Sequence, residues 1–529
     1  MFVDSRTLPE DYVVETDVCI IGGGAAGITM AREYLESSFK VCLLESGGLE
    51  PNGDTQGLYA GENVGQPYFP LDVARLRYFG GTTNHWGGVC RPFSESDFKT
   101  HDWIPYSGWP IGLIDLLPYY ERASDVLALN ADGWDLDYWK QYDDSLPFPF
   151  SDDRVETRLA MQSLSPVKRL GKTYRDEIKN SSSITTYFNS NVTGIETDVT
   201  GKTVKHLNVE CLSGNKFLVK ARFYVLAVGG IENARLLLLS NKVNPLGVGN
   251  QNDLVGRFFM EHPRFFAGIF YPSTPNISAG LYKWHNVNNS RLNGYLGLSE
   301  DVIKKEKLVD VQVRLDFVLE KRYVEASNSN GVSSLRHLLD SSSSKDDTYS
   351  FGEHIGNIVS DIDDVFISAY RKVRYDDFPF KHIELYPRVD QAPNPDSRVT
   401  LSDDLDQLGQ RRAKLDWKLS SIDMHSVKRT LEIMGVEMGK AGLGRLKLDI
   451  NDDGAWPIDT EGGWHHMGTT RMSDDASDGV VDKNCKVHGV SNLYVAGSSV
   501  FPTGGSGTPT LTLMALAIRL ADFIAEEAA

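Results

Sequence analysis

The first fifty residues alternate between short apolar runs and a glycine-rich turn, in the order of a strand–helix–strand unit. Residues 18–21 (VCII) form a continuous apolar run, which is typical of a parallel strand covered on both faces. Glycines follow at once in the segment 22–27 (GGGAAG), and Ile28, Ala31 and Leu35 then recur at helical spacing. The pattern predicts a buried strand, a tight turn and a helix with one apolar face.

The glycine spacing of this unit indicates an adenine dinucleotide site. Gly22, Gly24 and Gly27 fill the glycine positions of a G-x-G-x-x-G fingerprint. The first permits the tight turn, the second brings the backbone close to a pyrophosphate, and the third lets the helix pack on the strand. A second apolar run at 40–44 ends in Glu45, near the ~20-residue spacing expected for a carboxylate that holds a ribose hydroxyl. Redox chemistry is therefore expected.

Further strand-like segments recur along the chain, and the region between them is polar. They are predicted at 192–195, 217–219, 223–227, 265–271, 311–318, 383–388 and 492–497. Gly229 and Gly230 and a helix at 232–240 follow the third of these, which repeats the strand–glycine–helix order. Residues 325–350 predict a flexible insertion or surface loop that contains the polar run 341–347 (SSSSKDD). A final helix, apolar nearly all round at its start, is predicted at 509–526.

Composition narrows the class of protein. The chain has 529 residues, too many for one hydrophobic core, so two or three joined domains are expected. Hydrophobic residues make up 41% and charged residues 24%, which is ordinary for a globular protein. The formal net charge of −18 disfavours nucleic acid and anionic lipid as partners, because both are polyanionic.

Cysteine usage and the ends of the chain bear on location. The five cysteines are odd in number, widely spaced and without a C-x-x-C motif, so free thiols in a reducing compartment and no metal site are expected. The start of the chain lacks the pattern of a signal peptide, and the apolar stretch at 511–520 is too short and too charged to span a bilayer. The cytoplasm is the expected compartment, and export through a partner subunit stays open.

Three glycine-flanked segments carry candidate chemistry. The first is 463–469 (GWHHMGT), where a histidine on a loop could accept a proton near neutral pH; a structural histidine or a metal ligand is the alternative. The second is 504–510 (GGSGTPT), where Thr508 and Pro509 predict an N-cap and a first helical residue whose free N–H groups favour an anion. The third is His85 within the glycine-rich segment 80–88.

Taken together, these motifs resemble the glucose-methanol-choline (GMC) flavoprotein oxidoreductases from end to end. The segments that carry the resemblance are 22–27 with 43–48 (LLESGG), 80–86 (GGTTNHW), 255–263 (VGRFFMEHP), 394–399 (NPDSRV), 465–472 (HHMGTTRM) and 493–503 (LYVAGSSVFPT). Segments 108–111 (GWPI) and 117–120 (LPYY) are similar to the branch with pyranose oxidases and gluconate- and fructose-type dehydrogenases.

The resemblance implies FAD and a set of site residues. His465 is the implied catalytic base, with His466 and Trp464 as substrate contacts. The implied FAD contacts are Gly22, Gly24, Ala25, Ala26, Gly27, Glu45, Ser46, Gly81, Thr82, Asn84, His85, Trp86, Val192, Gly497, Pro509 and Thr510. Members of the family usually place a second His or Asn where this chain has Thr508, so Thr508 is expected to position substrate or only to cap the helix. His85 falls where some members bind FAD covalently, an attachment that varies and is not favoured here.

The implied fold is α/β. A discontinuous Rossmann-type FAD domain is expected from residues 1–100, 185–262 and 460–529. A substrate domain with a mainly antiparallel sheet and flanking helices is expected from residues 101–184 and 263–459.

The implied reaction oxidises a hydroxyl of a sugar or glycoside to a ketone or lactone, with hydride transfer to flavin N5 and His465 as base. The alternatives are a non-sugar alcohol oxidase or dehydrogenase, a lyase of the same family and a non-catalytic flavin electron relay. Oxygen, a quinone or a redox protein is expected to accept the electrons, and a homo-oligomer or a small accessory subunit stays open.

Overall fold

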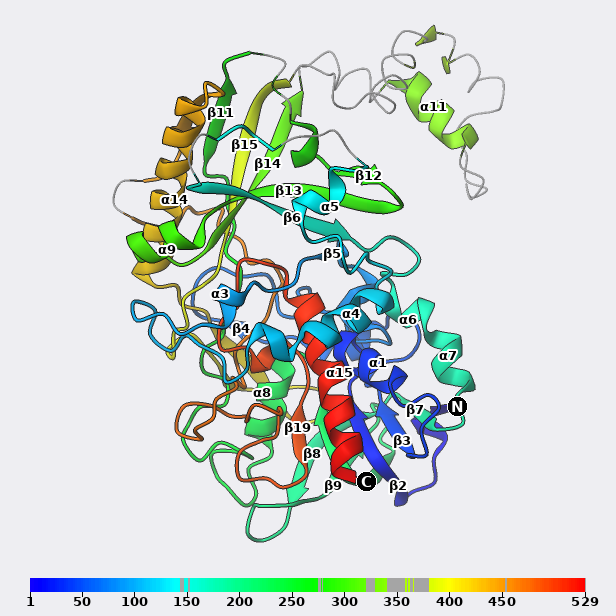
Figure 1. Cartoon of the computed structure of the whole chain (residues 1–529). Helices are drawn as coiled ribbons and strands as arrows, with labels where there is room; N and C mark the ends of the chain where they lie inside the picture. The colour runs from blue at the N-terminus through cyan, green and yellow to red at the C-terminus, as the bar shows by residue number, and fades with distance from the viewer. Residues whose placement is uncertain are drawn as a thin grey trace.

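Two sheet-based halves make up the molecule, one above the other in Figure 1. The computed structural model describes residues 1–142, 147–150, 153–274, 277, 279–319, 329–339, 357–358, 360–361, 365, 380–451 and 454–528. Both chain termini lie in the lower half, so the chain leaves this half, builds the upper one and returns.

The lower half is built on a mostly parallel sheet. Its order is β1-β7-β3-β2-β10-β9-β8, and β19 pairs in parallel with the end of β10. The strands are β1 (Phe2–Asp4), β2 (Tyr12–Ile21), β3 (Val41–Leu44), β7 (Ile184–Phe188), β8 (Asn191–Thr197), β9 (Val204–Glu210), β10 (Lys216–Leu226) and β19 (Leu493–Val495). The apolar runs of β2 and β3 are fully buried, as a sheet covered on both faces requires.

Helices from distant parts of the chain cover this sheet. They are α1 (Ala25–Arg32), α4 (Leu117–Val126), α6 (Leu170–Thr173), α7 (Arg175–Asn180), α8 (Gly230–Leu239) and α15 (Pro509–Ala528). The last helix, drawn in red, packs against both α1 and α4. The opening strand–helix–strand unit is thereby completed by the final helix.

Two predictions for this half need correction. Residues 217–219 and 223–227 were predicted as separate strands, but β10 runs through both, because β2 pairs along almost its whole length and carries the ladder past the exposed Lys220 and Arg222. The first helix ends at Arg32, so Leu35 lies in the following turn and not on the helix.

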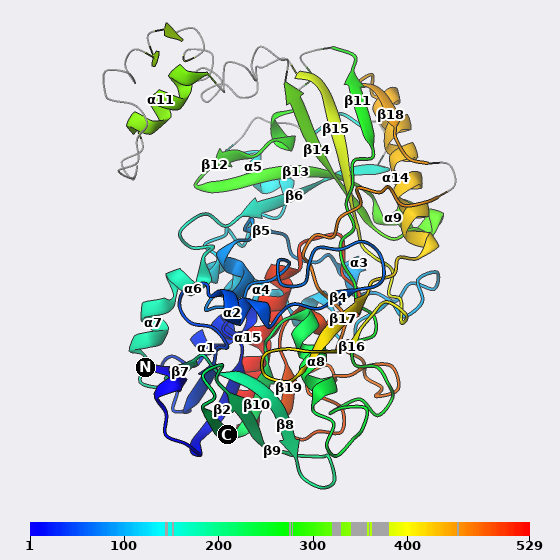
Figure 2. The same cartoon turned by 180° about the vertical axis from the view of Figure 1, so that it is seen from behind.

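The upper half is built on an antiparallel sheet, ordered β18-β11-β15-β14-β13-β6-β5, with β12 beside β13. Its strands are β5 (Val89–Cys90), β6 (Val155–Gln162), β11 (Gly268–Pro272), β12 (His285–Val287), β13 (Ser290–Leu298), β14 (Val311–Leu319), β15 (Phe380–Val389) and β18 (Gly444–Leu448). Helix α14 (Ser421–Lys440) and the shorter α9 (Glu300–Glu306) lie at one side of the sheet, as the view from behind in Figure 2 also shows. This half has its own hydrophobic core.

Short elements complete the structure. A small third sheet joins β4 (Glu62–Asn63), β16 (Arg398–Leu405) and β17 (Arg411–Asp416) beside α8. Further α-helices in the described ranges are α2 (Gly53–Gly57), α3 (Glu95–Phe98), α5 (Leu136–Trp139) and α11 (Asn330–Leu339). The single-turn helices are η1 (Ser5–Thr7), η2 (Gly81–Asn84), η3 (Leu113–Asp115), η4 (Gly280–Tyr282) and η6 (Ser498–Val500).

The predicted domain division stays a proposal. Helices α4, α6 and α7 and the strands β16 and β17 fall in ranges assigned to the substrate domain, yet their apolar residues belong to the core of the lower half. Helix α11 occupies part of the predicted insertion at 325–350, and the polar run 341–347 lies outside the described residues.

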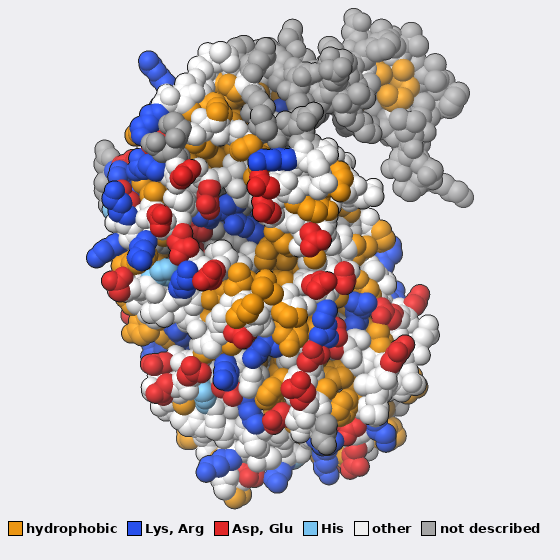
Figure 3. Space-filling model, viewed as in Figure 1, with side chains coloured by type: hydrophobic (Ala, Val, Ile, Leu, Met, Phe, Trp, Pro, Cys, Tyr) orange, Lys and Arg blue, Asp and Glu red, His pale blue; other side chains and the backbone are white. Residues whose placement is uncertain are grey.

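Other properties of the described part of the chain concern its surface and its thiols. All five cysteines are buried and unbridged. Acidic and basic side chains are interspersed over the face in Figure 3. Within the described ranges, no helix is long and apolar enough to cross a membrane, and no group of three or more His, Cys, Asp and Glu side chains has the arrangement of a metal site.

Candidate active site

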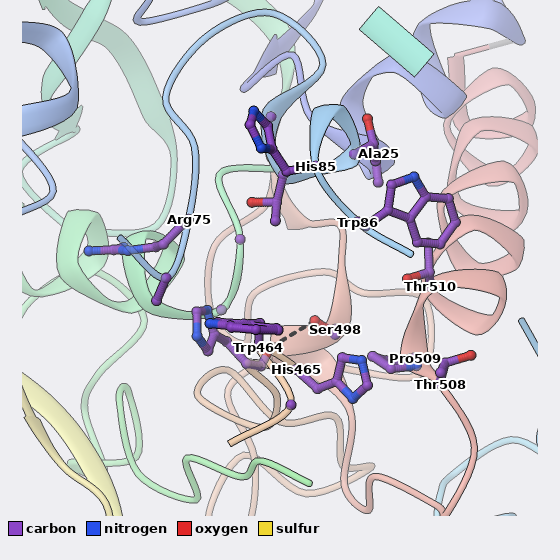
Figure 4. Close-up of a pocket in the computed structure, with 18 of the residues that line it drawn as sticks. Ala25, Arg75, His85, Trp86, Trp464, His465, Ser498, Thr508, Pro509 and Thr510 are labelled. Carbon is purple, nitrogen blue, oxygen red and sulfur yellow. Dashed lines mark hydrogen bonds between the residues drawn. The ribbon is translucent and has the colours of Figure 1, made fainter. Parts of the chain in front are cut away.

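A cavity of about 1040 Å³ is lined by residues of both halves. This volume lies at the upper end of the ~300–1,000 Å³ typical of ligand pockets. Predicted site residues that line it are Gly22, Gly24, Ala25, Ala26, Glu45, Ser46, Gly81, Thr82, His85, Trp86, Trp464, His465, His466, Gly497, Thr508, Pro509 and Thr510. In Figure 4, Ala25 and Trp86 lie at one side of the cavity and Trp464 and His465 at the other.

The glycine turn between β2 and α1 has the geometry that each glycine was predicted to provide. Gly22 has φ +107°, in the left-handed region that favours glycine. A Cβ on Gly27 would overlap the carbonyl oxygen of Gly22, whereas a Cβ on Gly24 would meet no protein atom within 4 Å and would project into open space. Helix α1 also begins without a side-chain cap, which leaves its first N–H groups available to an anion.

Glu45 lies at the end of β3, beside this turn. Its carboxylate accepts hydrogen bonds from the backbone N–H groups of Gly23, at 2.9 Å, and Gly47, at 2.8 Å. Burial raises the pKa of Glu45, and the two N–H donors act in the opposite direction. The carboxylate therefore braces the glycine turn from within the cavity wall.

Three predicted FAD contacts do not line this cavity. Gly27 lies behind the turn, where it permits the close approach of α1 to β2. Asn84 donates its side-chain N–H to the carbonyl oxygen of Phe79 at 2.9 Å, so it shapes the loop from behind. Val192 lines a smaller adjoining cavity of about 50 Å³, whose wall also includes Gly22 and Ser46.

The loop around His85 follows the turn helix η2. The ring nitrogen of Trp86 donates to the carbonyl oxygen of Lys168 at 2.6 Å, which ties the loop to residues before α6. His85 is exposed and lies at the far side of the cavity from His465 in Figure 4.

His465 is paired with a histidine that is distant in sequence. The Nδ1 atoms of His262 and His465 are 2.7 Å apart, and Nε2 of His262 lies 2.5 Å from the carbonyl oxygen of Gly505. A carbonyl only accepts hydrogen bonds, so His262 carries its proton on Nε2 and presents a lone pair at Nδ1. His465 must then donate from its own Nδ1, which leaves its Nε2 unprotonated.

Both rings of this pair are neutral. The pKa of His262 is lowered to about 3, mainly by burial and in smaller part by the charge of Arg388. Burial is also the main reason that the pKa of His465 is well below its usual range, followed by its coupling to His262 and by the charge of Arg388. The imidazole of His465 points toward Pro509 and Thr508 at the start of α15 (Figure 4).

Glu261 holds the loop that carries His465. Its carboxylate is fully buried and accepts from the backbone N–H groups of His262 at 3.0 Å, Gly463 at 2.8 Å and His465 at 3.0 Å. Tyr68 donates its hydroxyl to the same carboxylate. One carboxylate thus fixes both segments that supply the histidine pair.

The two neighbours of His465 in sequence have different surroundings. The Nε2 atom of His466 lies 2.8 Å from the Tyr68 hydroxyl, and burial lowers the pKa of His466 to about 3. Trp464 is 45% exposed and stacks on Phe69 with 4.9 Å between ring centroids. Its backbone has φ +58°, an unusual value for a bulky residue, which marks a turn held by its surroundings.

Thr508, Pro509 and Thr510 place the N-terminus of α15 at the cavity wall. The Thr508 hydroxyl donates to the carbonyl oxygen of Val89 at 2.8 Å, so its one proton is already engaged. This contact joins the start of α15 to β5, and it supports a positioning role for Thr508 more than donation to a substrate.

Comparison with known proteins agrees with this architecture. The GMC oxidoreductase family matches residues 393–517, which include His465 and the start of α15. The chain is 24% identical to 2-methyl-1,2-propanediol dehydrogenase of Mycolicibacterium austroafricanum over 96% of this chain and 95% of the relative. It is 22% identical to the fructose dehydrogenase large subunit of Gluconobacter japonicus over 97% and 98% of the two chains. Residues 393–517 therefore match the GMC oxidoreductase family, and the two relatives extend the similarity over almost the whole chain.

Two further likenesses are more limited. Over 133 residues, 25% of this chain and 24% of the relative, it is 37% identical to a C-glycoside 3-oxidase of Microbacterium trichothecenolyticum. The fold is similar to that of a formate oxidase, with a TM-score of 0.53 and 16% identity over 98% of this chain and 99% of that one. The family match and the relatives named dehydrogenase and oxidase together indicate an oxidoreductase.

The residues present fit the FAD that GMC proteins bind. The open space beside Gly24 is a cradle that a side chain would fill, and the uncapped start of α1 offers free N–H groups that suit an anion. The start of α15 lies at the wall that also holds His465. The cavity is thus lined at one side by groups suited to a pyrophosphate and at the other by groups suited to the reacting ring.

Sequence reasoning missed His262 and Glu261 as site residues, although both lie in the family segment 255–263. The contact of His262 with His465 spans about two hundred residues, so no local spacing reveals it. The only available signal was that a Glu-His pair occurs in a segment shared with the family.

Proposed function

We propose that this protein oxidises a hydroxyl of a sugar or glycoside, with His465 as the base. The observation that carries the proposal is the fixed tautomer of His465, whose unprotonated Nε2 belongs to a ring that lines the cavity. The relatives named fructose dehydrogenase and C-glycoside 3-oxidase support the substrate class.

In the proposed reaction, Nε2 of His465 accepts the proton of the substrate hydroxyl as the C–H bond is broken. FAD supplies the hydride acceptor when it is bound. The Nδ1–H bond to His262 holds the ring in place during the transfer, and Glu261 fixes the loop beneath it. General base assistance of this kind contributes ~10²–10⁴-fold in rate.

FAD would be held by residues of both termini. We propose that Gly22, Gly24 and Glu45 hold its adenosine diphosphate part, and that Pro509 and Thr510 lie against its ring system. The free N–H groups at the start of α15 favour negative charge there. His85 is proposed as a non-covalent neighbour.

An anaerobic visible spectrum tests the function. A panel of sugars, glycosides and simple diols is added to the FAD-loaded protein, and bleaching of the flavin band by a sugar or glycoside is expected. Bleaching by diols alone favours the alternative that the propanediol dehydrogenase relative supports. A flavin that no alcohol bleaches contradicts the proposal and favours a lyase or an electron relay.

His465→Ala tests the base. Flavin reduction by the substrate should fall at least ~10²-fold, because general base assistance is lost, while FAD stays bound. His466→Ala is the matched control, since His466 contacts Tyr68, and it should reduce the rate much less. A reversed order of the two effects would show that the assignment is off by one residue.

A further inference from the structure

The antiparallel sheet presents an arginine-rich face to the cavity. Gln312 and Arg314 alternate with buried apolar residues along β14, and Tyr386 and Arg388 do the same along β15. Gln312 lies opposite Arg388, and Arg314 lies opposite Tyr386. Since residues two apart share one face of a strand, all four point to the same side, and all four line the cavity.

Arg388 on this face has no acidic partner among the described residues. Its Nε donates to the carbonyl oxygen of Ser506 at 3.1 Å and its Nη2 to Oε1 of Gln312 at 2.5 Å, both uncharged acceptors. Asp310, whose charge also reaches Arg388, is paired with Arg158 at 2.5 Å. Burial lowers the pKa of Arg388, as expected for a cation that lacks a counter-ion.

Two hydrogen-bond donors close to Arg388 on this face have no acceptor. Nε2 of Gln312 and Nε of Arg314 are both buried without a hydrogen-bond partner, and Gln312 is only 1% exposed. Buried donors are normally satisfied, so their shared side of the cavity lacks an acceptor.

None of the acidic residues that line the cavity forms an ion pair with Arg388. Arg314 is paired with Asp316 at 2.6 Å, and Arg264 with Glu461 at 3.1 Å. Asp316 is not part of the lining, whose acids are Glu461, the exposed Asp459 and Glu45 beside the glycine turn.

From this arrangement we propose that the substrate carries a carboxylate, held by Arg388 and Gln312 with Arg314 beside them. The inference rests on the proposed function and narrows its substrate to a sugar acid or an acidic glycoside. A carboxylate only accepts hydrogen bonds and matches the planar fork of an arginine.

The anion site is joined to the base by consecutive backbone groups. The carbonyl oxygen of Ser506 holds Arg388, and that of Gly505 holds His262, the partner of His465. A substrate anchored through its carboxylate therefore has its ring held on the side of the cavity where Nε2 accepts a proton. The face shown in Figure 3 mixes both charges, so the selection for an anion is assigned to the cavity and not to that surface.

Binding without oxidation tests the site. The affinity of FAD-loaded protein for cyclohexanecarboxylate and for cyclohexanecarboxamide is measured by calorimetry, since neither ligand has a hydroxyl to oxidise. The carboxylate should bind at least ~10-fold more tightly, the effect of a charge-assisted hydrogen bond, and added salt should weaken it. Equal affinities would overturn the proposal.

Variants locate the site. Arg388→Gln should remove the preference for the carboxylate over the amide, whereas Arg222→Gln, on the exposed surface of β10, should keep it. If Arg388→Gln does not retain its flavin, Gln312→Glu is tested in its place. This variant keeps the side-chain oxygen that accepts from Arg388 and replaces the unpaired Nε2 donor of Gln312. Unchanged carboxylate binding in a folded variant overturns the assignment.

Flavin reduction by glucuronate and by glucose separates this proposal from the function on which it rests. Faster bleaching by glucuronate supports both. Bleaching by glucose alone overturns the carboxylate site and leaves the sugar oxidation standing. Selective binding of cyclohexanecarboxylate with no bleaching by any alcohol supports the anion site and contradicts the oxidation.

Discussion

The chemistry of the site depends on which nitrogen of one histidine carries a proton. The chain of contacts from Gly505 through His262 to His465 fixes that nitrogen, and no carboxylate of the described residues lies at hydrogen-bond distance from either ring. A neutral partner raises the basicity of the ring less than a carboxylate would, and it keeps the buried pair free of net charge. The arrangement suits a base that must remain unprotonated.

His262 is predicted to act through His465. His262→Ala should lower the rate of flavin reduction ~10-fold or more, because the ring of His465 loses its orientation and its preferred tautomer. His262→Asn should restore part of the rate, since its amide oxygen can accept the Nδ1 proton.

Nitrogen NMR of the ring distinguishes this role from loss of packing. In the native protein Nε2 of His465 should give the signal of an unprotonated nitrogen, and His262→Ala should move it toward a mixture. An unchanged signal in a variant with a lower rate would contradict the positioning role.

The pH dependence of the reaction follows from the lowered pKa of His465. A base must be neutral to accept a proton, and burial keeps this ring neutral well below pH ~6.5. The rate of flavin reduction should therefore remain high as the pH falls through 6.5 and decrease only further into acid. Stopped-flow reduction across pH checks this, and an acid limb centred at or above 6.5 contradicts it.

Among the elements, the turn between β2 and α1 shows most clearly which residues are needed for packing and which for space that a ligand can occupy. Gly27 is pressed against Gly22, and Gly24 faces the open cavity, although they are three residues apart on the same turn. One glycine is required by the fold and the other by whatever occupies the cavity.

Substituting each of these glycines by alanine should give opposite results. Gly27→Ala should lower the free energy of unfolding by ~1–3 kcal/mol or more, because its Cβ has no room against the Gly22 carbonyl. Gly24→Ala should leave the stability of the FAD-free protein nearly unchanged and weaken FAD binding.

Thermal unfolding with and without FAD measures both effects. If Gly24→Ala bound FAD as tightly as the native chain, the assignment of the pyrophosphate to this turn would be wrong.

For the molecule as a whole, the buried neutral histidines bear on its stability in acid. His466 has a pKa of about 3 when folded, against ~6.5 when unfolded, so below pH 6.5 only the unfolded chain takes up its proton. The stability it contributes is complete above 6.5 and is lost as the pH falls toward 3. Asp423, whose pKa burial raises to about 7, acts in the opposite direction.

His466→Gln should therefore remove about 1.4 kcal/mol of acid destabilisation for each pH unit below 6.5. The measurement is the difference in unfolding free energy between native and variant protein, by urea titration at pH 7.5 and at pH 5, because a difference cancels the contribution of Asp423. A difference that does not change with pH contradicts the assignment.

Local sequence patterns predicted the helices and strands well. They did not predict contacts between residues that are distant in the chain. The strands at 311–318 and 383–388 were predicted from their apolar alternation, but the register that sets Gln312 opposite Arg388 depends on long-range pairing. The GMC fold was predicted and is confirmed by the comparisons. The roles of His465 and Thr508 stay predictions.

The break predicted in β10 shows why long-range contacts could not be predicted from the local sequence. Polar Lys220 and Arg222 read as the end of a strand, yet they continue it, because the neighbouring strand and not the local sequence determines the pairing. In the same way, His262 gains its partner only when two loops about two hundred residues apart are brought together by Glu261.

The pairing of β19 with β10 has a consequence for how the protein is made. β10 leaves the ribosome with its pairing edge at residues 224–226 open, and its partner follows only after the entire antiparallel half has been synthesised. At ~5–20 residues per second that delay is on the order of tens of seconds. During this interval the nascent chain exposes an unpaired strand edge, which invites aggregation. The nascent chain is thus predicted to need chaperone protection until α15 emerges, and the cofactor can load only after that.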